Sequence, residues 1–131
     1  MYREITIQEA LKQQNALLID VRSEEEFNRA TIPGAVNIPL FNNEERAEIG
    51  TVYHQEGPEP ARRLGLKLVA PKLPAKIDSI DKISNGQKLI VFCWRGGLRS
   101  QFMASILDTM GYSVSRIVGG YKAYRHYVNE Y

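Results

Sequence analysis

The chain has 131 residues, enough for one domain that buries its own hydrophobic core without disulfides or a metal. Apolar residues make up 44% and charged residues 24%, as in ordinary soluble globular proteins, and the net charge of +2 is too small to indicate nucleic-acid binding by itself. One cysteine excludes an intramolecular disulfide and favours a reducing compartment, and no apolar run has the length of a signal region or a membrane span. We expect a cytoplasmic protein that does not contact membranes.

The first predicted elements are a short helix and a buried strand. Thr6 and Glu9 have the spacing of a capping box, so a helix should begin just after Thr6. Its inner face is expected to carry Ile7, Ala10 and Leu11. Residues 16–19 form an uninterrupted apolar run that is typical of a buried strand, and Asp20-Val21-Arg22 ends this strand.

A second capping box, Ser23 with Glu26, predicts a brief helix up to Arg29. A turn at residues 32–35 and a short strand at residues 36–38 follow. Strands that alternate with helices indicate an α/β fold, with a parallel sheet covered by helices on both faces. Ligands of such sheets lie beyond the carboxyl ends of the strands, where Asp20 and Cys93 both fall.

Residues 41–74 are less regular and include a basic helix face. Asn43 is expected to cap a helix that runs to Gln55, and Gly57-Pro58 should end it. Residues 59–69 fit a further helix with an apolar face of Ala61, Leu64 and Leu68. The other face and the residues after it carry Arg62, Arg63, Lys67 and Lys72. A solvated helix face is the ordinary interpretation of these charges, and the alternative is a contact strip for RNA phosphates.

A helix at residues 76–84 and a turn at Asn85-Gly86 lead into an apolar strand at residues 89–92. After a loop, apolar residues recur at the spacing of a helix, and Gly111 is suited to the position just after its end. These apolar residues are Phe102, Met103, Ile106, Leu107 and Met110.

Residues 113–118 fit a last strand, and Gly119-Gly120 a tight turn. A terminal helix then carries tyrosines along one face, at positions Tyr121, Tyr124, Tyr127 and Tyr131. Packing against the sheet is the ordinary interpretation of this face, and a docking surface for another domain is the alternative.

The loop after residues 89–92 is rich in glycine and begins with Cys93, the only cysteine of the chain. The loop amides and the N-terminus of the following helix should point inward and form an anion-binding nest. Arg95 and Arg99 add positive charge, so the Cys93 side chain should be largely thiolate, the form that acts as a nucleophile. A buried structural cysteine is the alternative, but the adjacent Gly96-Gly97 and the arginines favour a catalytic loop.

The order of these motifs resembles that of rhodanese-like domains. Asp20-Val21-Arg22, then IPGAVNIP at residues 32–39, a cysteine at a strand end and Gly119-Gly120 carry this resemblance. More specifically, FCWRGGLRS at residues 92–100 is similar to the active loop of tRNA 2-selenouridine synthases. Further stretches similar to that family are PLF (39–41), NEER (43–46), GTVY (50–53), GP (57–58), LVAPK (68–72) and GGYKAY (119–124). The resemblance covers nearly the whole chain and implies one rhodanese-like domain over residues 1–131.

The resemblance implies replacement of sulfur by selenium at the 2-position of a wobble uridine in tRNA, with selenophosphate as the donor. Cys93 would attack the donor chalcogen and carry it as a persulfide or perselenide, and phosphate or sulfite would leave as an anion without a general acid. Asp20 and Arg22 would brace the neighbouring loop. The donor would be bound by the loop residues Trp94, Arg95, Gly96, Gly97, Leu98 and Arg99.

The same family normally continues into a second domain with a P-loop, but nothing in this chain matches GxxxxGK[ST]. Contact with tRNA is therefore expected through a missing or separately encoded P-loop domain, and DNA is not an expected partner. No cofactor is expected beside the chalcogen donor. A metal is not expected either, because the sequence has no cluster with metal-ligand spacing.

Other functions fit parts of the pattern. Cys93 to Arg99 has the C-x5-R spacing of cysteine phosphatases and arsenate reductases, but Phe92 stands where phosphatases usually have a histidine, and the loop has no acid for an alkoxide leaving group. One cysteine also excludes arsenate reduction through a relay of internal cysteines. A thiosulfate-type sulfurtransferase or persulfide carrier would need neither RNA contacts nor a partner domain. A non-enzymatic binding module would not need Cys93, so the presence of this residue argues against it.

Overall fold

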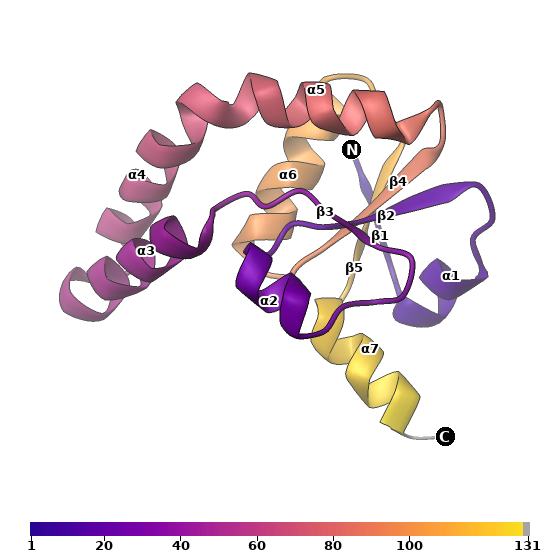
Figure 1. The fold of residues 1–131 in the computed structure, drawn as a ribbon, viewed down its shortest axis with the longest axis horizontal. Coiled ribbons are helices and arrows are strands. Elements are labelled where there is room, and N and C mark those ends of the chain that lie inside the picture. Colours follow the sequence, from indigo (N-terminus) through magenta and orange to yellow (C-terminus); the bar gives the residue numbers. More distant parts are fainter. Residues whose placement is uncertain (130–131) are drawn as a thin grey trace.

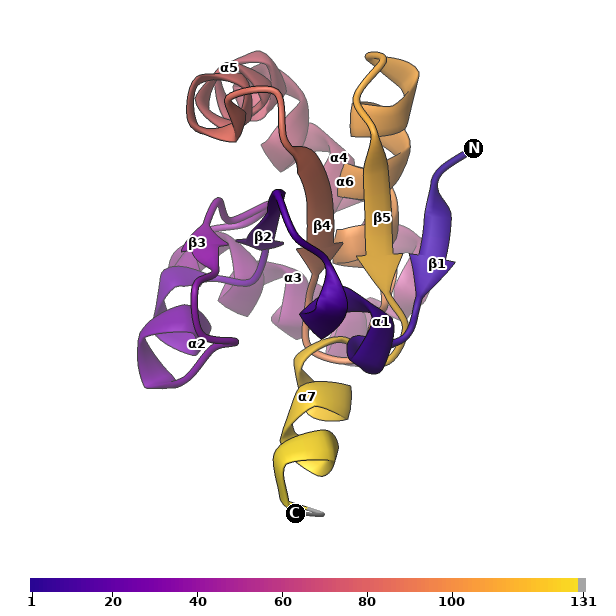
Figure 2. The same cartoon turned by 90° about the vertical axis from the view of Figure 1, so that its right-hand side faces the viewer.

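A parallel sheet of five strands lies at the centre of the protein, which a computed structural model describes over residues 1–129 (Figure 1, Figure 2). The order across the sheet is β1-β5-β4-β2-β3. The register places Asp20, the last residue of β2, opposite Phe92 of β4 and Asn37 of β3. Cys93 therefore follows the central strand at the sheet edge where β2 also ends, as the sequence predicts. The strands are β1 (Arg3–Ile5), β2 (Ala16–Asp20), β3 (Val36–Asn37), β4 (Lys88–Phe92) and β5 (Val114–Ile117).

Helices fill the connections between the strands. The long connection from β3 to β4 holds α3, α4, a short 3-10 helix and α5, and α3 and α4 lie side by side at one end of the molecule (Figure 1). Gly57, with a φ of +95°, separates α3 from α4, and Pro58 begins α4, so the predicted break at this pair is confirmed. The helices are α1 (Ile7–Lys12), α2 (Glu24–Arg29), α3 (Asn43–Glu56), α4 (Pro58–Val69), η1 (Ala70–Lys72), α5 (Leu73–Ser84), α6 (Leu98–Thr109) and α7 (Gly120–Asn129).

Alternate residues of each strand face two different layers of helices, because strand side chains have a period of two. Leu89 and Val91 of β4 contribute to a core with residues of α4, α5 and α6. Ile90 and Phe92 contribute to a second core, with residues of α1 and α7. The predicted parallel sheet with helices on both faces is therefore confirmed, and Cys93 continues the row that faces α6.

The two predicted capping boxes are present at α1 and α2, and a third begins α3. The prediction that Asn43 caps α3 is wrong by one residue. Asn42 is the cap: its Oδ1 accepts from the Glu45 amide at 2.8 Å, and its own amide donates to Glu45 at 2.9 Å. Asn43 is not available for this role because its Oδ1 accepts a hydrogen bond from the amide of Glu25 at 2.9 Å.

Other expectations also differ from the structure. Leu11 is 40% exposed, since it lies about 100° around the helix from the buried Ala10. Met110 is 62% exposed because it follows the last residue of α6, where helical spacing no longer applies. Strand β1 was not predicted. Its sequence shows no alternation of apolar and polar side chains, because Arg3 and Glu4 are both exposed at the sheet edge.

The tyrosine face of α7 packs inward, as the ordinary interpretation predicts. Tyr121 is buried, and Tyr124 and Tyr127 are partly buried against the second core. Tyr131, the last of the predicted row, lies outside the described residues. No helix within residues 1–129 combines the length and the apolar character needed to cross a membrane.

Candidate active site

Cys93 lies directly after β4, at the start of the loop that leads into α6. Its side chain is 2% exposed and belongs to the core layer that contains α6. The Sγ atom lies 3.1 Å from Oγ of Ser100, in the first turn of α6, and 3.8 Å from the carbonyl oxygen of Gly97. The fold therefore places the predicted nucleophile against the first turn of a helix, with a hydroxyl as its nearest polar neighbour.

Ser100 and Arg116 belong to this site, although neither residue was predicted from the sequence. The Ser100 hydroxyl is buried and donates to the carbonyl of Gly97 at 3.2 Å. Arg116 of β5 is 4% exposed, and its Nη1 donates to Ser100 Oγ at 3.4 Å and to the carbonyl of Gly96. Its Nη2 donates to Glu4 at 3.0 Å. An arginine inside a buried strand was the available signal, because a buried charge requires specific partners.

The first turn of α7 holds the loop from the other side. The amide of Tyr121 donates to the carbonyl of Cys93 at 2.8 Å, and the amide of Lys122 donates to that of Trp94 at 2.9 Å. Gly120 has a φ of +56°, and a Cβ atom at this position would lie 2.3 Å from the Cys93 carbonyl oxygen. The predicted turn at Gly119-Gly120 therefore requires glycine both for its conformation and for its contact with the loop.

The two arginines of the loop have different surroundings. Arg95 is exposed. Arg99 instead donates to the carboxylate of Glu26 at 2.6 Å and 3.3 Å, and Arg46 approaches the same carboxylate to 3.2 Å. Burial would raise the pKa of Glu26, but the hydrogen bond and charge of Arg99, the backbone of Ser23 and the charge of Arg46 hold this pKa below its ordinary value. An anion that is to be bound by Arg99 must therefore compete with Glu26.

Asp20 and Arg22 form a buried ion pair beside the loop. Arg22 Nη2 lies 2.8 Å from Asp20 Oδ2, and Nε lies 3.0 Å from Oδ1. The same carboxylate accepts from the hydroxyl of Thr31 at 2.8 Å, and Arg22 donates to the carbonyl of Ala30 at 2.7 Å. The guanidinium lies over the ring of Tyr121, 4.4 Å from its centroid. These contacts join β2 to the turn after α2 and to α7, and the bracing of the active loop by this pair stays a prediction.

The predicted basic strip lies on α4 and η1. Its residues Arg62, Arg63, Lys67 and Lys72 are all exposed. Arg63 pairs with Glu59 at 3.4 Å, and Lys72 pairs with Glu45 at 2.8 Å. The strip is therefore accessible, but part of its charge is already paired within the chain.

A groove of about 1170 Å³ extends between this strip and the start of α6. Its walls come from α3, α4, α6 and the segment before α3 and are mainly apolar, with Phe41 and Phe102 among the lining residues. Arg62 of the strip and Arg99 of the loop both line it, whereas Cys93 does not. The groove thus connects the basic strip with the outer side of the active loop.

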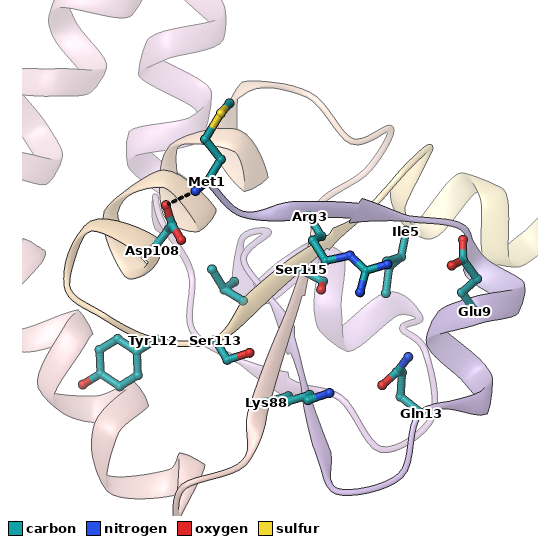
Figure 3. A pocket seen from close by; sticks show the side chains of 11 residues that line it. Met1, Arg3, Ile5, Glu9, Gln13, Lys88, Asp108, Tyr112, Ser113 and Ser115 are labelled. Carbon is teal, nitrogen blue, oxygen red and sulfur yellow. Dashed lines mark ion pairs between the residues drawn. The ribbon is translucent and has the colours of Figure 1, made fainter.

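A smaller pocket of about 290 Å³ lies toward the opposite edge of the sheet (Figure 3). It is lined by residues at the amino ends of β4 and β5, including Lys88 and Ser113. The amino group of Met1 approaches Asp108 to 3.5 Å at its rim. Cys93, Arg95 and Arg99 are not among the residues that line it, so this pocket is separate from the active loop.

Within the described part of the chain, no group of three or more His, Cys, Asp or Glu side chains is arranged to hold a metal ion. The chemistry that the site offers is nucleophilic: one thiol, a buried hydroxyl, and arginines on either side of the loop. Such a site suits transfer of an atom or group between anionic partners.

Comparison with known proteins supports this assignment. The family model of the Rhodanese-like domain matches residues 6–127. The tRNA 2-selenouridine synthase of Bdellovibrio bacteriovorus is 40% identical over 120 residues, which are 90% of this chain and 32% of that protein. The enzyme of the same name from Nitrosomonas europaea is 41% identical over 113 residues, which are 85% of this chain and 29% of that protein. This chain thus spans about a third of the length of these relatives (32% and 29%).

Solved structures agree with the sequence relatives. The crystal structure of the N-terminal domain of a candidate ATP/GTP binding protein from Clostridium difficile 630 superimposes with a TM-score of 0.90. The two chains are 36% identical, and the match covers 95% of this chain and 97% of that one. The human single-domain sulfurtransferase TSTD1 shares the fold, with a TM-score of 0.55 at 23% identity over 96% of this chain and 97% of that one. The chain belongs to the rhodanese-like domain family.

Proposed function

We propose that this chain transfers sulfur or selenium through a Cys93 persulfide or perselenide, as the rhodanese-like domain of a tRNA 2-selenouridine synthase. The observation that carries the proposal is the position of Cys93, the only cysteine of the chain, at the carboxyl end of the central strand and against the first turn of α6. The relatives named tRNA 2-selenouridine synthase, about 40% identical, support selenium as the atom carried.

The loading step has a simple electron balance. The Cys93 thiolate attacks the outer sulfur of thiosulfate, the new S–S bond forms, and sulfite leaves with the electron pair of the bond that breaks. The same attack on selenophosphate forms an Sγ–Se bond, and the electron pair of the broken Se–P bond leaves on phosphorus. This pair takes a proton from water, so the product is phosphite rather than the phosphate expected from the sequence. Sulfite leaves as a stable anion and water supplies the proton of phosphite, so neither step needs a proton donor from the protein, which agrees with a loop of residues 93–99 without Asp, Glu or His.

In this proposal the exposed Arg95 attracts the anionic donor, and the loop amides hold its oxygen atoms. Arg99 binds the donor only after exchange with Glu26, its present partner. Trp94 walls the entrance of the loop and packs near Tyr121, with ring centroids 5.8 Å apart. No cofactor beyond the donor takes part.

We further propose that tRNA is the acceptor and that it is bound mainly by a P-loop domain that continues the chain or is encoded separately. Arg62, Arg63, Lys67 and Lys72 would then contact RNA phosphates from this domain. The limited share of the relatives' length that this chain spans, and the candidate nucleotide binding of the Clostridium difficile protein, support a nucleotide-binding part elsewhere.

Intact mass after separate incubation with selenophosphate and with thiosulfate tests the carried atom, with Cys93→Ser as the control. We expect a one-selenium adduct in the unchanged chain and none in Cys93→Ser. Phosphorus NMR of the supernatant distinguishes loading, which releases phosphite, from spontaneous hydrolysis, which releases phosphate. A sulfur adduct alone would replace the proposal by a general sulfurtransferase, and no adduct from either donor would refute the chalcogen-transfer proposal.

A further inference from the structure

Three polar side chains from three different elements form a continuous path beneath the active loop. Cys93 follows β4, Ser100 lies in α6 and Arg116 lies in β5. Cys93 Sγ is 3.1 Å from Ser100 Oγ, and Ser100 Oγ is 3.4 Å from Arg116 Nη1. All three are almost fully buried, with 2%, 0% and 4% of their surfaces exposed. Because little water screens them, the positive charge of Arg116 acts on the hydroxyl in a medium of low dielectric constant.

The hydrogen-bond pattern depends on the protonation state of Cys93. When Cys93 is a thiol, its S–H donates to Ser100 Oγ, and the Ser100 hydroxyl donates to the carbonyl of Gly97 at 3.2 Å. When Cys93 is a thiolate, Sγ can only accept, so the Ser100 hydroxyl must turn toward it. Arg116 Nη1 can donate to Ser100 Oγ in both states. In the thiolate state this donation polarises the hydroxyl and strengthens its bond to sulfur.

From this geometry we infer that Arg116 is a positioning residue that stabilises the Cys93 thiolate through the Ser100 hydroxyl. The inference deepens the proposed function and rests on it for its role in transfer. When a nucleophilic acceptor, such as a thiol, attacks the outer chalcogen with its own electron pair, the new bond to that atom forms, the bond from that atom to Sγ breaks and its electron pair goes to Sγ. The thiolate that leaves is then the same species that Ser100 and Arg116 stabilise, so the pair assists both loading and discharge.

Other charged groups around Cys93 are less suited to this task. Arg95 is exposed, where water screens its charge, and Arg99 is neutralised by its pair with Glu26. On the neighbouring β2, Asp20 and Arg22 compensate each other as an ion pair, and Lys122 of α7 is exposed. Arg116 has one carboxylate partner, Glu4, whose side chain is 51% exposed, and its buried Nε has no hydrogen-bond partner within residues 1–129. Its charge is therefore only partly compensated.

A contact between Arg116 and the active loop adds a second constraint. The same Nη1 atom donates to the carbonyl of Gly96, whose φ of +73° turns the loop at this residue. A Cβ atom at Gly96 would lie 3.0 Å from Arg116 Nη1 and 2.9 Å from the amide nitrogen of Gly119. Arg116 therefore contacts the loop backbone and Ser100 with one group, which holds Ser100 Oγ next to sulfur.

The test measures the rate of iodoacetamide alkylation across a pH series, since only thiolate reacts and the chain has a single cysteine. This readout does not depend on any chalcogen donor, so it can fail or succeed independently of the proposed function. We expect Ser100→Ala and Arg116→Met each to slow alkylation by roughly tenfold at pH values well below the midpoint of the unchanged chain, where the thiolate is the minor form. Arg116→Lys, which keeps the charge, should restore part of the rate.

The double variant decides whether Arg116 acts through Ser100. If it does, Ser100→Ala with Arg116→Met is no slower than the slower single variant. Ser79→Ala and Arg29→Met, which remove an exposed hydroxyl and an exposed positive charge, are matched controls and should leave the profile unchanged. Circular dichroism checks folding, and Arg116→Gln replaces Arg116→Met if the latter does not fold. An unchanged midpoint in the neutral Arg116 variant, or additive effects in the double variant, would overturn the inference.

Discussion

Gly120 offers a sharp test of how closely α7 supports the active loop, and we predict the effect of Gly120→Ala. A Cβ atom at this position would lie 2.3 Å from the carbonyl oxygen of Cys93 and 2.8 Å from the amide nitrogen of Gly96. Both are backbone atoms, which cannot give way as a flexible side chain can. The first turn of α7 must therefore move away from the loop.

The magnitude follows from what this movement breaks. An alanine in the left-handed region, at the φ of +56° of Gly120, costs about 1–2 kcal/mol. The hydrogen bonds from the amides of Tyr121 and Lys122 to the carbonyls of Cys93 and Trp94 are lost as well, at about 1 kcal/mol each. We expect the free energy of unfolding to fall by about 3–4 kcal/mol in total.

Gly111→Ala is the matched control for this substitution. Gly111 has a φ of +94°, but no atom lies within 4 Å of its Cβ position, so only the conformational cost of about 1–2 kcal/mol applies. Urea unfolding of both variants, with the alkylation rate of Cys93, provides the measurement. Gly120→Ala should be the less stable variant and the only one with an altered alkylation rate. Equal losses of stability, together with an unchanged alkylation rate in Gly120→Ala, would refute the close contact between α7 and the loop.

Three further predictions concern stability. Arg22→Met should cost about 3–5 kcal/mol in urea unfolding, because the fully buried carboxylate of Asp20 loses its counter-charge; a loss of about 0–1 kcal/mol, typical of exposed pairs, would contradict this. Glu26→Gln should lower the Tm at neutral pH. Burial would raise the pKa of Glu26, but its arginine partners hold it below the ordinary value, so its stabilisation is complete above about pH 4.3 and is lost as the pH falls through the folded-state pKa. Thermal melts should therefore show the Tm difference shrinking toward acid pH, and a constant difference would argue against the ion pair. Met103→Ala, at 0% exposure, should cost about 2–5 kcal/mol, whereas Met110→Ala, at 62% exposure, should stay within about 0.5 kcal/mol; equal values in urea unfolding would contradict the burial pattern.

Much of the fold could be predicted from local sequence. The capping boxes at Thr6 and Ser23 need only residues three positions apart, and the apolar run at residues 89–92 needs only its neighbours. The break at Gly57-Pro58 follows from the backbone preferences of the two residues. The same local rules could not choose between Asn42 and Asn43, because both residue types are equally suited to cap α3. The side chain of Asn43 accepts a hydrogen bond from the amide of Glu25 in α2, and Asn42 is therefore the cap.

The site was predicted in part. Its nucleophile could be named because a lone cysteine, a glycine-rich turn and a helix start are adjacent in the chain. Its supporting groups could not, because they come from distant segments: Arg99 pairs with Glu26 across 73 positions, and Arg116 pairs with Glu4 across 112. No local pattern specifies which charge meets which across such distances.

The amino-acid sequence by itself therefore determined the α/β class, the rhodanese-like motifs and the identity of Cys93 as the candidate nucleophile, since each depends on residues that are close together in the chain. The tertiary structure alone decided that Arg99 forms an ion pair with Glu26, that α7 donates hydrogen bonds to the loop, and that Arg116 donates a hydrogen bond to Ser100. The physical reason is the register of the parallel sheet, which brings the ends of separate strands to one edge and so sets which buried charges and hydroxyls surround the thiol.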